Sequence, residues 1–350
     1  MNVSRINRVI ENMKAEGLRQ ILVTAPASVF YLTGVWVHPG ERMLALHVKD
    51  DGSVMLYANR LFALKGNVDV PLTEFDDIDD CVAILAKGID AGDIGIDKVW
   101  PSQFTIRLME ARSDIRPVLG SHPVDVARMM KDAEEVQLML ESSRKNVEVC
   151  RRTQEALKEG MTENEVQDIY IKIAAELGTA GPSFEPLVCF GANCAEPHHS
   201  SDGTKLKKGD AVILDVGVLW KDYCSDMTRT CFFGGEPTEE EQKVYDVVYA
   251  ANRAAIAAAK PGVKMKDIDL AARKVIEDAG YGPYFIHRTG HGIGLEVHEH
   301  PDCSATNETI ARPGMIFSIE PGIYLPGKFG VRYEDLIVIT EDGCMVLTEA

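Results

Sequence analysis

The alternation of apolar and polar positions predicts helices and strands in turn over residues 1–112. Apolar side chains recur at helical spacing over residues 3–16, and Gly17 is a typical residue to end that helix. Short apolar runs predict strands at 20–24, 43–48, 54–57 and 93–96. Asp50-Asp51-Gly52 separates two of them with the composition of a hairpin turn. With a further helix expected over 103–112, this segment is predicted to be an α/β unit.

The regular pattern is interrupted near residues 116–128. Pro117, Gly120 and Pro123 fall in this stretch, and residues of these types disfavour helices and central strands. We therefore expect no regular element there and place a domain boundary in it. The prediction is an N-terminal domain of residues 1–125 and a C-terminal domain of residues 126–350.

The second half combines long helices with neighbouring strands. An amphipathic helix is predicted over 132–158 and another over 266–279. Thr162 with Glu165, and Thr238 with Glu241, each fit the capping box that begins a helix. Strands are expected at 211–218, 223–233, 315–320, 331–339 and 344–348. Because short turns join successive strands, we expect an antiparallel sheet and an α+β fold for this domain.

The composition of the chain indicates which kinds of partner and which cellular compartment to expect. The chain has 37 Lys and Arg against 54 Asp and Glu, a formal charge of −17, which would repel nucleic acid and anionic lipid. Its apolar runs are too short to span a membrane, and residues 1–10 lack the apolar core of a signal peptide. The eight cysteines form no C-x-x-C pair. We expect a cytoplasmic protein with reduced thiols that binds neither nucleic acid nor membrane.

Two aspartates are candidates for chemistry. Asp215 ends an apolar run, and a buried carboxylate is costly unless it is paired or binds a metal. Asp226 follows eleven residues later, with Lys221-Asp222 between them as the expected turn of a hairpin. Such a hairpin would bring the two aspartates across from each other, where they repel unless a cation lies between them. Taken singly, Asp226 is better explained as an ordinary surface strand residue and Asp215 as an ordinary turn residue.

A second candidate segment is rich in glycine and histidine. It contains His287, His291 and His298, three of the nine histidines of the chain, interspersed with glycines at 290, 292 and 294. The glycines disfavour a helix and let the backbone approach a bound group closely. Their spacing fits neither a dinucleotide-binding loop nor a phosphate-binding loop, and no zinc-protease H-E-x-x-H is present. A single histidine here would be an ordinary loop residue; three together favour a site.

Two acids near the C-terminus complete the candidate set. Glu320 ends one predicted strand and Glu334 lies inside another. Arg332 is two positions before Glu334, so we expect both on one face of that strand, where Arg332 can steady the carboxylates. Alone, Glu334 would fit a solvent-facing strand residue equally well.

Four carboxylates and one imidazole form a ligand set that suits hard divalent cations. The set is Asp215, Asp226, His291, Glu320 and Glu334. It favours Mn²⁺, Fe²⁺ or Co²⁺ over the thiolate-bound zinc of structural sites, and it is large enough for two ions. Paired ions roughly 3.5–4 Å apart can share a hydroxide nucleophile and polarise a carbonyl, which is the usual arrangement for hydrolysis.

The ordered set of ligands resembles the metal motif of the pita-bread metallopeptidases of peptidase family M24, which include Xaa-Pro dipeptidase (prolidase), aminopeptidase P and methionine aminopeptidase. The phrases Asp-Tyr-Cys-Ser-Asp-Met-Thr-Arg-Thr (222–230), His-Gly-Ile-Gly-Leu-Glu-Val-His-Glu (291–299) and Ser-Ile-Glu-Pro-Gly-Ile-Tyr (318–324) carry the resemblance. It implies an α+β pita-bread catalytic domain preceded by a smaller α/β domain of the creatinase/prolidase type.

The resemblance also implies roles for single residues. Asp215 would bind one metal, His291 with Glu320 the other, and Asp226 with Glu334 would bridge the two. Glu320 would also act as the acid/base of the reaction. His298 would stabilise the tetrahedral intermediate, His198 would hold the substrate near the scissile bond, and His287 would line the proline-side pocket. His199, beside His198, is interpreted as a bystander.

The presence of the N-terminal domain and the short gap between Glu320 and Glu334 are similar to the Xaa-Pro branch. The expected function is therefore hydrolysis of Xaa-Pro bonds at the N-terminus of short peptides by two divalent ions, Mn first, with Co, Fe or Zn as alternatives. Asp302 stands where some prolidases carry a basic residue, which favours substrates longer than dipeptides. A methionine or broad-specificity aminopeptidase and a catalytically silent partner-binding protein are the alternative functions.

The same resemblance implies a homodimer. The segment 35–42 could then reach a partner's site through Trp36 and His38, although it also fits a loop packed on its own domain.

Overall fold

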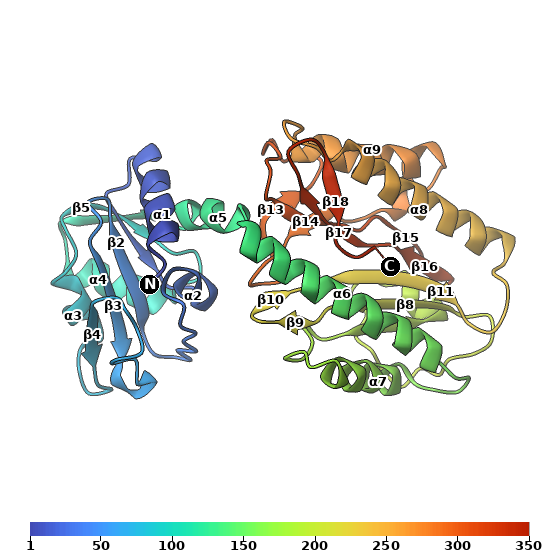
Figure 1. The fold of residues 1–350 in the computed structure, drawn as a ribbon, viewed down its shortest axis with the longest axis horizontal. Coiled ribbons are helices and arrows are strands. Elements are labelled where there is room, and N and C mark those ends of the chain that lie inside the picture. Colours follow the sequence, from blue (N-terminus) through green and yellow to red (C-terminus); the bar gives the residue numbers. More distant parts are fainter. Residues whose placement is uncertain (350) are drawn as a thin grey trace. The chain divides into compact units, whose positions relative to one another are not determined.

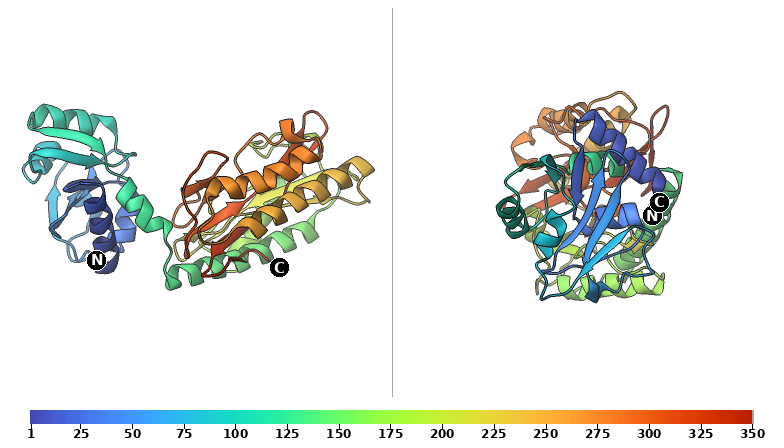
Figure 2. Two further views of the ribbon diagram at one scale, coloured as in Figure 1. Left: turned by 90° about the horizontal axis from the view of Figure 1, so that it is seen from above. Right: turned by 90° about the vertical axis from the view of Figure 1, so that its left-hand side faces the viewer.

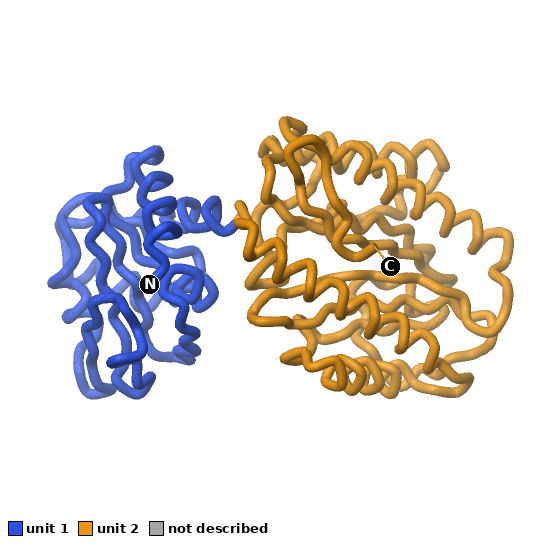
Figure 3. The backbone as a smooth tube through the Cα atoms, in the orientation of Figure 1, with its two compact units in different colours: residues 1–128 blue, residues 129–350 orange. Residues whose placement is uncertain are grey.

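The protein is described here by a computed structural model that covers residues 1–349. These residues form two compact units, unit 1 (Met1–Arg128) and unit 2 (from Met129 onward), which Figure 3 shows in different colours. Each unit has its own buried core, so each is described by itself.

Unit 1 is built on a six-stranded sheet with the order β4-β3-β2-β1-β5-β6 (Figure 1). Its strands are β1 (Gln20–Val23), β2 (Leu44–Lys49), β3 (Val54–Asn59), β4 (Leu72–Phe75), β5 (Gly92–Ile96) and β6 (Ile115–Leu119). Its helices are α1 (Val3–Ala15), α2 (Pro26–Thr33), α3 (Cys81–Ala86), α4 (Ser102–Ala111) and α5 (His122–Met129), with a short 3-10 helix at Arg60–Phe62.

The sheet of unit 1 is mixed, as expected for an α/β unit. Strands β2 and β3 are antiparallel neighbours on either side of Gly52, which has a φ of 94°, whereas β5 runs parallel to both β1 and β6. Helices α3 and α4 cover one face, where Leu85 and Leu108 belong to one buried cluster with strand residues such as Ile94. Figure 2 shows α1 on the other side of the sheet from α4.

The expectation of no regular element at residues 116–128 was wrong. Pro117 lies in β6, which is the edge strand of the sheet, where a missing backbone N–H removes no bond to a further strand. Gly120 is required by close packing, because a Cβ at this position would lie 2.5 Å from Cα of Gly95. Pro123 is the second residue of α5, a position in the first turn where proline is tolerated.

Unit 2 contains four long helices and several short sheets. The helices are α6 (Ala133–Ala156), α7 (Glu163–Glu176), α8 (Glu239–Ala258) and α9 (Met265–Asp278), with 3-10 helices at Gly191–Ala195 (η2) and Gly282–Tyr284 (η3). The strands are β7 (Leu187–Phe190), β8 (Ala211–Val216), β9 (Leu219–Trp220), β10 (Tyr223–Cys224), β11 (Met227–Phe232), β12 (Gly290–Gly292), β13 (Glu299–Cys303), β14 (Ile316–Ile319), β15 (Gly322–Leu325), β16 (Phe329–Arg332), β17 (Asp335–Ile339) and β18 (Cys344–Val346).

The strands of unit 2 lie between two pairs of helices (Figure 1). One sheet has the order β11-β8-β7 and another the order β13-β12-β14-β17-β18, and all their described pairings are antiparallel. Helices α6 and α7 pack on the first sheet through a buried cluster that includes Val149, Tyr170 and Leu214. Capping boxes at Thr162 and Thr238 begin α7 and α8, as predicted. The mixture of helices and antiparallel sheets confirms the α+β fold expected for this half.

Among the residues that the structure describes, no helix is long and apolar enough to cross a membrane.

Candidate metal centre

The five candidate ligands line one cavity of about 600 Å³ in unit 2. Each comes from a different part of the strand system: Asp215 from β8, Asp226 from the connection of β10 to β11, His291 from β12, Glu320 from the residue after β14, and Glu334 from the connection of β16 to β17. The fold therefore brings together residues that lie far apart in the sequence.

The ligand atoms of this group are close enough to share cations. His291 Nε2 lies 3.6 Å from Asp226 Oδ2 and 3.4 Å from Glu320 Oε1. Asp226, His291 and Glu334 each offer a ligand atom within 4.8 Å of the others. Asp215 stands at the same cavity wall, where its Oδ2 accepts a hydrogen bond of 2.7 Å from Arg332.

The two aspartates do not face each other across a regular hairpin, so the expected register was wrong. In the β8–β11 pairing Asp215 is opposite Thr228, and Asp226 lies just before β11 begins. The turn itself is where it was expected: Lys221 and Asp222 have φ of 46° and 72°, both in the left-handed region that a two-residue hairpin turn requires. Asp226 reaches the cavity because the chain leaves the strand pairing there.

Two of the buried carboxylates each have one oxygen without a hydrogen-bond partner among the described residues. Asp226 and Glu334 are 4% and 1% exposed, and burial followed by neighbouring carboxylates raises the pKa of both well above the ordinary range. Asp226 Oδ1 and Glu334 Oε1 have no hydrogen-bond partner among the described residues. Burial, opposed mainly by Arg332, raises the pKa of Glu320 to about 7. Orphaned buried oxygens of this kind are what divalent cations satisfy, so the donor set fits metal.

His291 is arranged as a neutral ligand. Burial lowers its pKa to about 3, and its Nδ1 lies 3.1 Å from the carbonyl oxygen of Gly292, to which it donates. That hydrogen bond leaves the lone pair of Nε2 directed at the carboxylates of Asp226 and Glu320. A lone pair facing carboxylate oxygens is unfavourable unless a cation lies between them, which is a second observation in favour of metal.

Arg332 supports the carboxylates, although by a different route from the one expected. Strand β16 ends at Arg332, so Arg332 and Glu334 do not share the face of one continuous strand. Instead Arg332 donates to Asp215, and its Nε donates to Thr228 Oγ1 over 3.1 Å. Thr228 Oγ1 in turn donates to Glu334 Oε2 over 2.8 Å. The Arg332 guanidinium and the Thr228 hydroxyl therefore connect the candidate ligands Asp215 and Glu334.

Three further histidines line the cavity: His198, His287 and His298. The His298 ring lies 4.3 Å from that of His291, edge to face. His287 donates from Nδ1 to the carbonyl oxygen of Arg288 over 2.7 Å and accepts from Tyr324 through Nε2 over 2.8 Å. Burial lowers the pKa of His287 to about 4, so it is neutral near pH 7 and its orientation is set by these two bonds.

Sequence analysis missed several residues of the cavity wall. They are Phe184, Glu185, Leu187, Pro197, Arg288 and Val297. Arg288 is exposed and gives the wall a positive charge beside the histidines. No pattern in the sequence distinguishes these residues from ordinary positions, because only the folded chain brings them to one cavity.

Asp302, expected near the substrate, is engaged elsewhere. Its carboxylate accepts hydrogen bonds from the Ser304 hydroxyl and from Asn307 Nδ2, and it is absent from the described residues that line the cavity. In unit 1, Trp36 stacks between Phe30 and His38, with ring centroids 4.6 Å and 6.0 Å away. Its reach into a partner stays a prediction.

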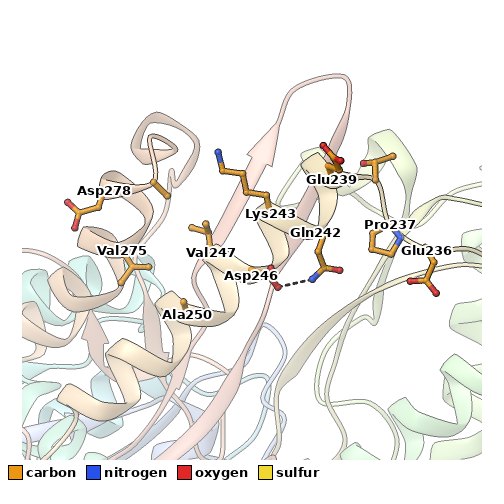
Figure 4. A pocket seen from close by; sticks show the side chains of 12 residues that line it. Glu236, Pro237, Glu239, Gln242, Lys243, Asp246, Val247, Ala250, Val275 and Asp278 are labelled. Atoms are coloured by element: carbon orange, nitrogen blue, oxygen red, sulfur yellow. Dashed lines mark hydrogen bonds between the residues drawn. The ribbon is translucent and has the colours of Figure 1, made fainter.

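A larger hollow of about 930 Å³ lies along α8 and α9 (Figure 4). Its carboxylates are spread apart rather than gathered, from Glu236 before α8 to Asp278 at the end of α9, and Gln242 donates to Asp246 over 2.7 Å. Histidine and cysteine are absent from the residues that the structure describes along it. This hollow therefore lacks the ligand chemistry of the cavity around His291.

Comparison with known proteins agrees with this geometry. Residues 137–341 match the metallopeptidase family M24, and residues 5–130 match the creatinase/prolidase N-terminal domain. The chain belongs to metallopeptidase family M24. This confirms the resemblance stated from the sequence, including the two-domain architecture.

Among relatives of this M24 member is an uncharacterized peptidase of Staphylococcus saprophyticus, which is 37% identical over 98% of this chain and 99% of its own length. A dipeptidase from Pyrococcus horikoshii is similar in structure, with a TM-score of 0.93, 39% identity and coverage of 99% of this chain and 98% of its own. A prolidase from Thermococcus sibiricus is also similar in structure, with a TM-score of 0.94 and 33% identity. The match covers 100% of this chain and 98% of the prolidase chain.

Proposed function

We propose that this M24 peptidase is a metal-dependent Xaa-Pro dipeptidase. The single observation that carries the proposal is the cavity in which Asp226, His291 and Glu334 meet with orphaned carboxylate oxygens. The similarity to a dipeptidase and to a prolidase supports the choice of substrate.

The proposed cofactor is a pair of divalent ions, with Mn²⁺ first and Co²⁺, Fe²⁺ or Zn²⁺ as alternatives. Asp215, Asp226, His291, Glu320 and Glu334 would hold them. Such ions supply Lewis-acid polarisation of a carbonyl and a hydrolytic nucleophile at neutral pH.

The surrounding side chains would orient the peptide and handle protons. His298, whose ring contacts that of His291, would donate a hydrogen bond to an oxygen that gains negative charge. His198, which lines the cavity, would hold the peptide near the scissile bond. Glu320, at the cavity wall, would hold the proton that must reach the leaving nitrogen of proline.

Two observations favour a dipeptide over a longer peptide. Arg288 offers a cation that can pair with the free carboxylate of a C-terminal proline. Asp302, which argued for longer substrates, is occupied by Ser304 and Asn307. The apolar side chains Phe184, Leu187 and Val297 would contact the Xaa side chain or the proline ring, and His287 would line the proline side.

A homodimer in the cytoplasm is part of the proposal. In it, Trp36 and His38 of one subunit would reach the partner's cavity. A Trp36→Ala protein that remains dimeric yet loses Xaa-Pro turnover would support this reach, and unchanged kinetics would contradict it.

The test is hydrolysis of three peptides, with added Mn²⁺ and with chelator: an Xaa-Pro dipeptide, an Xaa-Pro-Yaa tripeptide and a Met-Ala-Yaa control. We expect metal-dependent cleavage of the dipeptide alone. Cleavage of the tripeptide would indicate an aminopeptidase P, and cleavage of the Met-Ala peptide a broader aminopeptidase. If none is cleaved while metal is bound, the catalytic proposal is wrong.

A further inference from the structure

Glu163 accepts four hydrogen bonds inside unit 2, next to the loop that carries His198. Its side chain is fully buried. One carboxylate oxygen accepts from the backbone N–H of Phe190 over 2.8 Å and from Asn193 Nδ2 over 3.0 Å. The other accepts from His199 Nε2 over 2.8 Å and from the backbone N–H of Asp202 over 2.9 Å. All four donors belong to the segment 190–202, so one carboxylate organises the whole loop.

Hydrogen bonds also run from helix α7 to this loop. Glu163 is the first residue of α7, where the positive end of the helix dipole favours a carboxylate. The free backbone N–H groups of this first turn, at Glu163 and Asn164, donate to the carbonyl oxygens of Thr204 and Asp202, each over 3.2 Å. The N–H groups that a helix start leaves without partners are therefore satisfied by the end of the same loop.

His198 is an exposed residue of this loop and lies between Cys194 and Ser201, which are both held by the rest of unit 2. On one side Cys194 is fully buried, and its thiol lies 3.3 Å from the carbonyl oxygen of Cys189. On the other side the Ser201 hydroxyl accepts from the N–H of Val188 over 2.9 Å. His198 lines the metal-site cavity while the next residue, His199, contacts Glu163. The direction of the His198 side chain thus depends on where His199 is held.

The spacing of Glu163, His199 and Asp202 would also fit a metal ion, since each offers a ligand atom within 4.8 Å of the others. Their oxygens, however, already have N–H donors: two on each oxygen of Glu163, and the N–H of Thr204, 2.6 Å away, on Asp202. A cation would have to displace these donors. Asp226, in contrast, has an oxygen with no donor among the described residues.

We propose that Glu163 and His199 are positioning residues that hold His198 against the metal-site cavity, a role that rests on the function proposed above. His199 was expected to be a bystander, and its bond to Glu163 argues otherwise. Because displacement of a substrate-contacting group by about 1 Å can cost on the order of 10²-fold in rate, loss of this bond should be visible in catalysis.

The kinetic test compares His199→Leu, which removes the donor, with His199→Gln, which keeps one. We expect His199→Leu to lower kcat/KM for an Xaa-Pro dipeptide by roughly 10- to 100-fold, and His199→Gln to restore it to within about 3-fold. Glu196→Gln, an exposed position on the same loop, is the matched control. In a His198→Ala background, His199→Leu should have no further effect, because His199 acts through His198.

A second measurement does not depend on activity. Hydrogen exchange on the metal-free full chain should show faster exchange at residues 190–204 in His199→Leu than in wild type, with strands β12 and β14 unchanged. If wild type cleaves no Xaa-Pro peptide, the proposed function fails, and this measurement alone then decides whether Glu163 and His199 order the loop. Unchanged exchange, an additive loss in the double variant, or loss of one bound metal in His199→Leu would each overturn the proposal.

Discussion

The guanidinium of Arg332 lies 2.7 Å from a carboxylate oxygen of Asp215 and is almost completely buried. The same group reaches Tyr324, whose hydroxyl donates to His287. One buried cation thus connects a candidate metal ligand with the histidine on the proposed proline side. We therefore expect its removal to disturb both the proposed metal binding and the proposed substrate binding.

Arg332→Lys should weaken divalent-metal affinity by roughly 10- to 100-fold, because lysine retains the charge but not the planar fork of donors. Competition with a fluorescent chelator measures this affinity directly. Arg116→Lys is the control, since Arg116 forms a similar pair with Asp93 at an exposed position of unit 1. Equal affinities in wild type and both variants would contradict the supporting role of Arg332.

Asp226→Asn should abolish turnover and lower metal stoichiometry while leaving the fold intact. In the metal-free protein the change removes a buried carboxylate that neighbouring carboxylates repel, so the free energy of unfolding should rise, on the order of 1–3 kcal/mol. Thermal unfolding with chelator and with Mn²⁺ separates the two effects. Wild-type activity with wild-type metal content would show that the dinuclear site is wrongly assigned.

Arg288→Ala should raise KM for an Xaa-Pro dipeptide by about 10-fold or more, because the free carboxylate loses its ionic partner. For the corresponding Xaa-Pro amide, which has no carboxylate, KM should change little. Steady-state kinetics with the two substrates give the comparison. An equal effect on both would mean that Arg288 acts on the cavity in general and not on the carboxylate.

His47 should make unit 1 sensitive to acid. Burial lowers its pKa to about 4, and its Nε2 lies 3.2 Å from Gln20 Oε1, to which it donates. Between about pH 6.5 and 4 the unfolded chain binds a proton that the folded chain does not, so stability is present at higher pH and is lost as pH falls. The loss over this window is at most about 3 kcal/mol.

The comparison for this prediction is His47→Gln, which retains a donor for Gln20 and does not titrate. Hydrogen-exchange protection of β1 and β2 in the two proteins, corrected for the intrinsic effect of pH on exchange, should differ little at pH 7. Below pH 6.5 the protection of β1 and β2 should fall in wild type and remain higher in the His47→Gln variant. Parallel curves at every pH would assign the acid sensitivity to other groups.

Local signals in the sequence predicted the long helices of unit 2, whereas α2, α3 and α5 of unit 1 were not predicted. Thr162 and Thr238 begin α7 and α8 because capping depends on residues three apart, which a sequence displays directly. The strands were predicted less well where the site lies. The run 331–339 was expected as one strand, but the structure divides it at Tyr333 and Glu334 into β16 and β17.

The second misjudged strand has the same cause. The run 223–233 divides at Ser225 and Asp226 into β10 and β11. In both places the backbone leaves the strand pairing where a carboxylate turns into the cavity, and apolar periodicity contains no signal for such a break. Arg288 was not predicted, and His199 was interpreted as a bystander, for a related reason: the roles proposed for them depend on contacts that sequence spacing does not encode.

The proposed metal ligands come from distant parts of unit 2, from Asp215 in β8 to Glu334 between β16 and β17. The proposed pair of cations would tie distant parts of the chain together, so the concentration of free metal would act on folding by mass action. For each such site, free metal at 100 times the dissociation constant would add about 2.7 kcal/mol to the stability of the folded form. The described residues of unit 1 supply none of these ligands. A shortage of metal would therefore shorten the lifetime of unit 2 against proteases while leaving that of unit 1 unchanged.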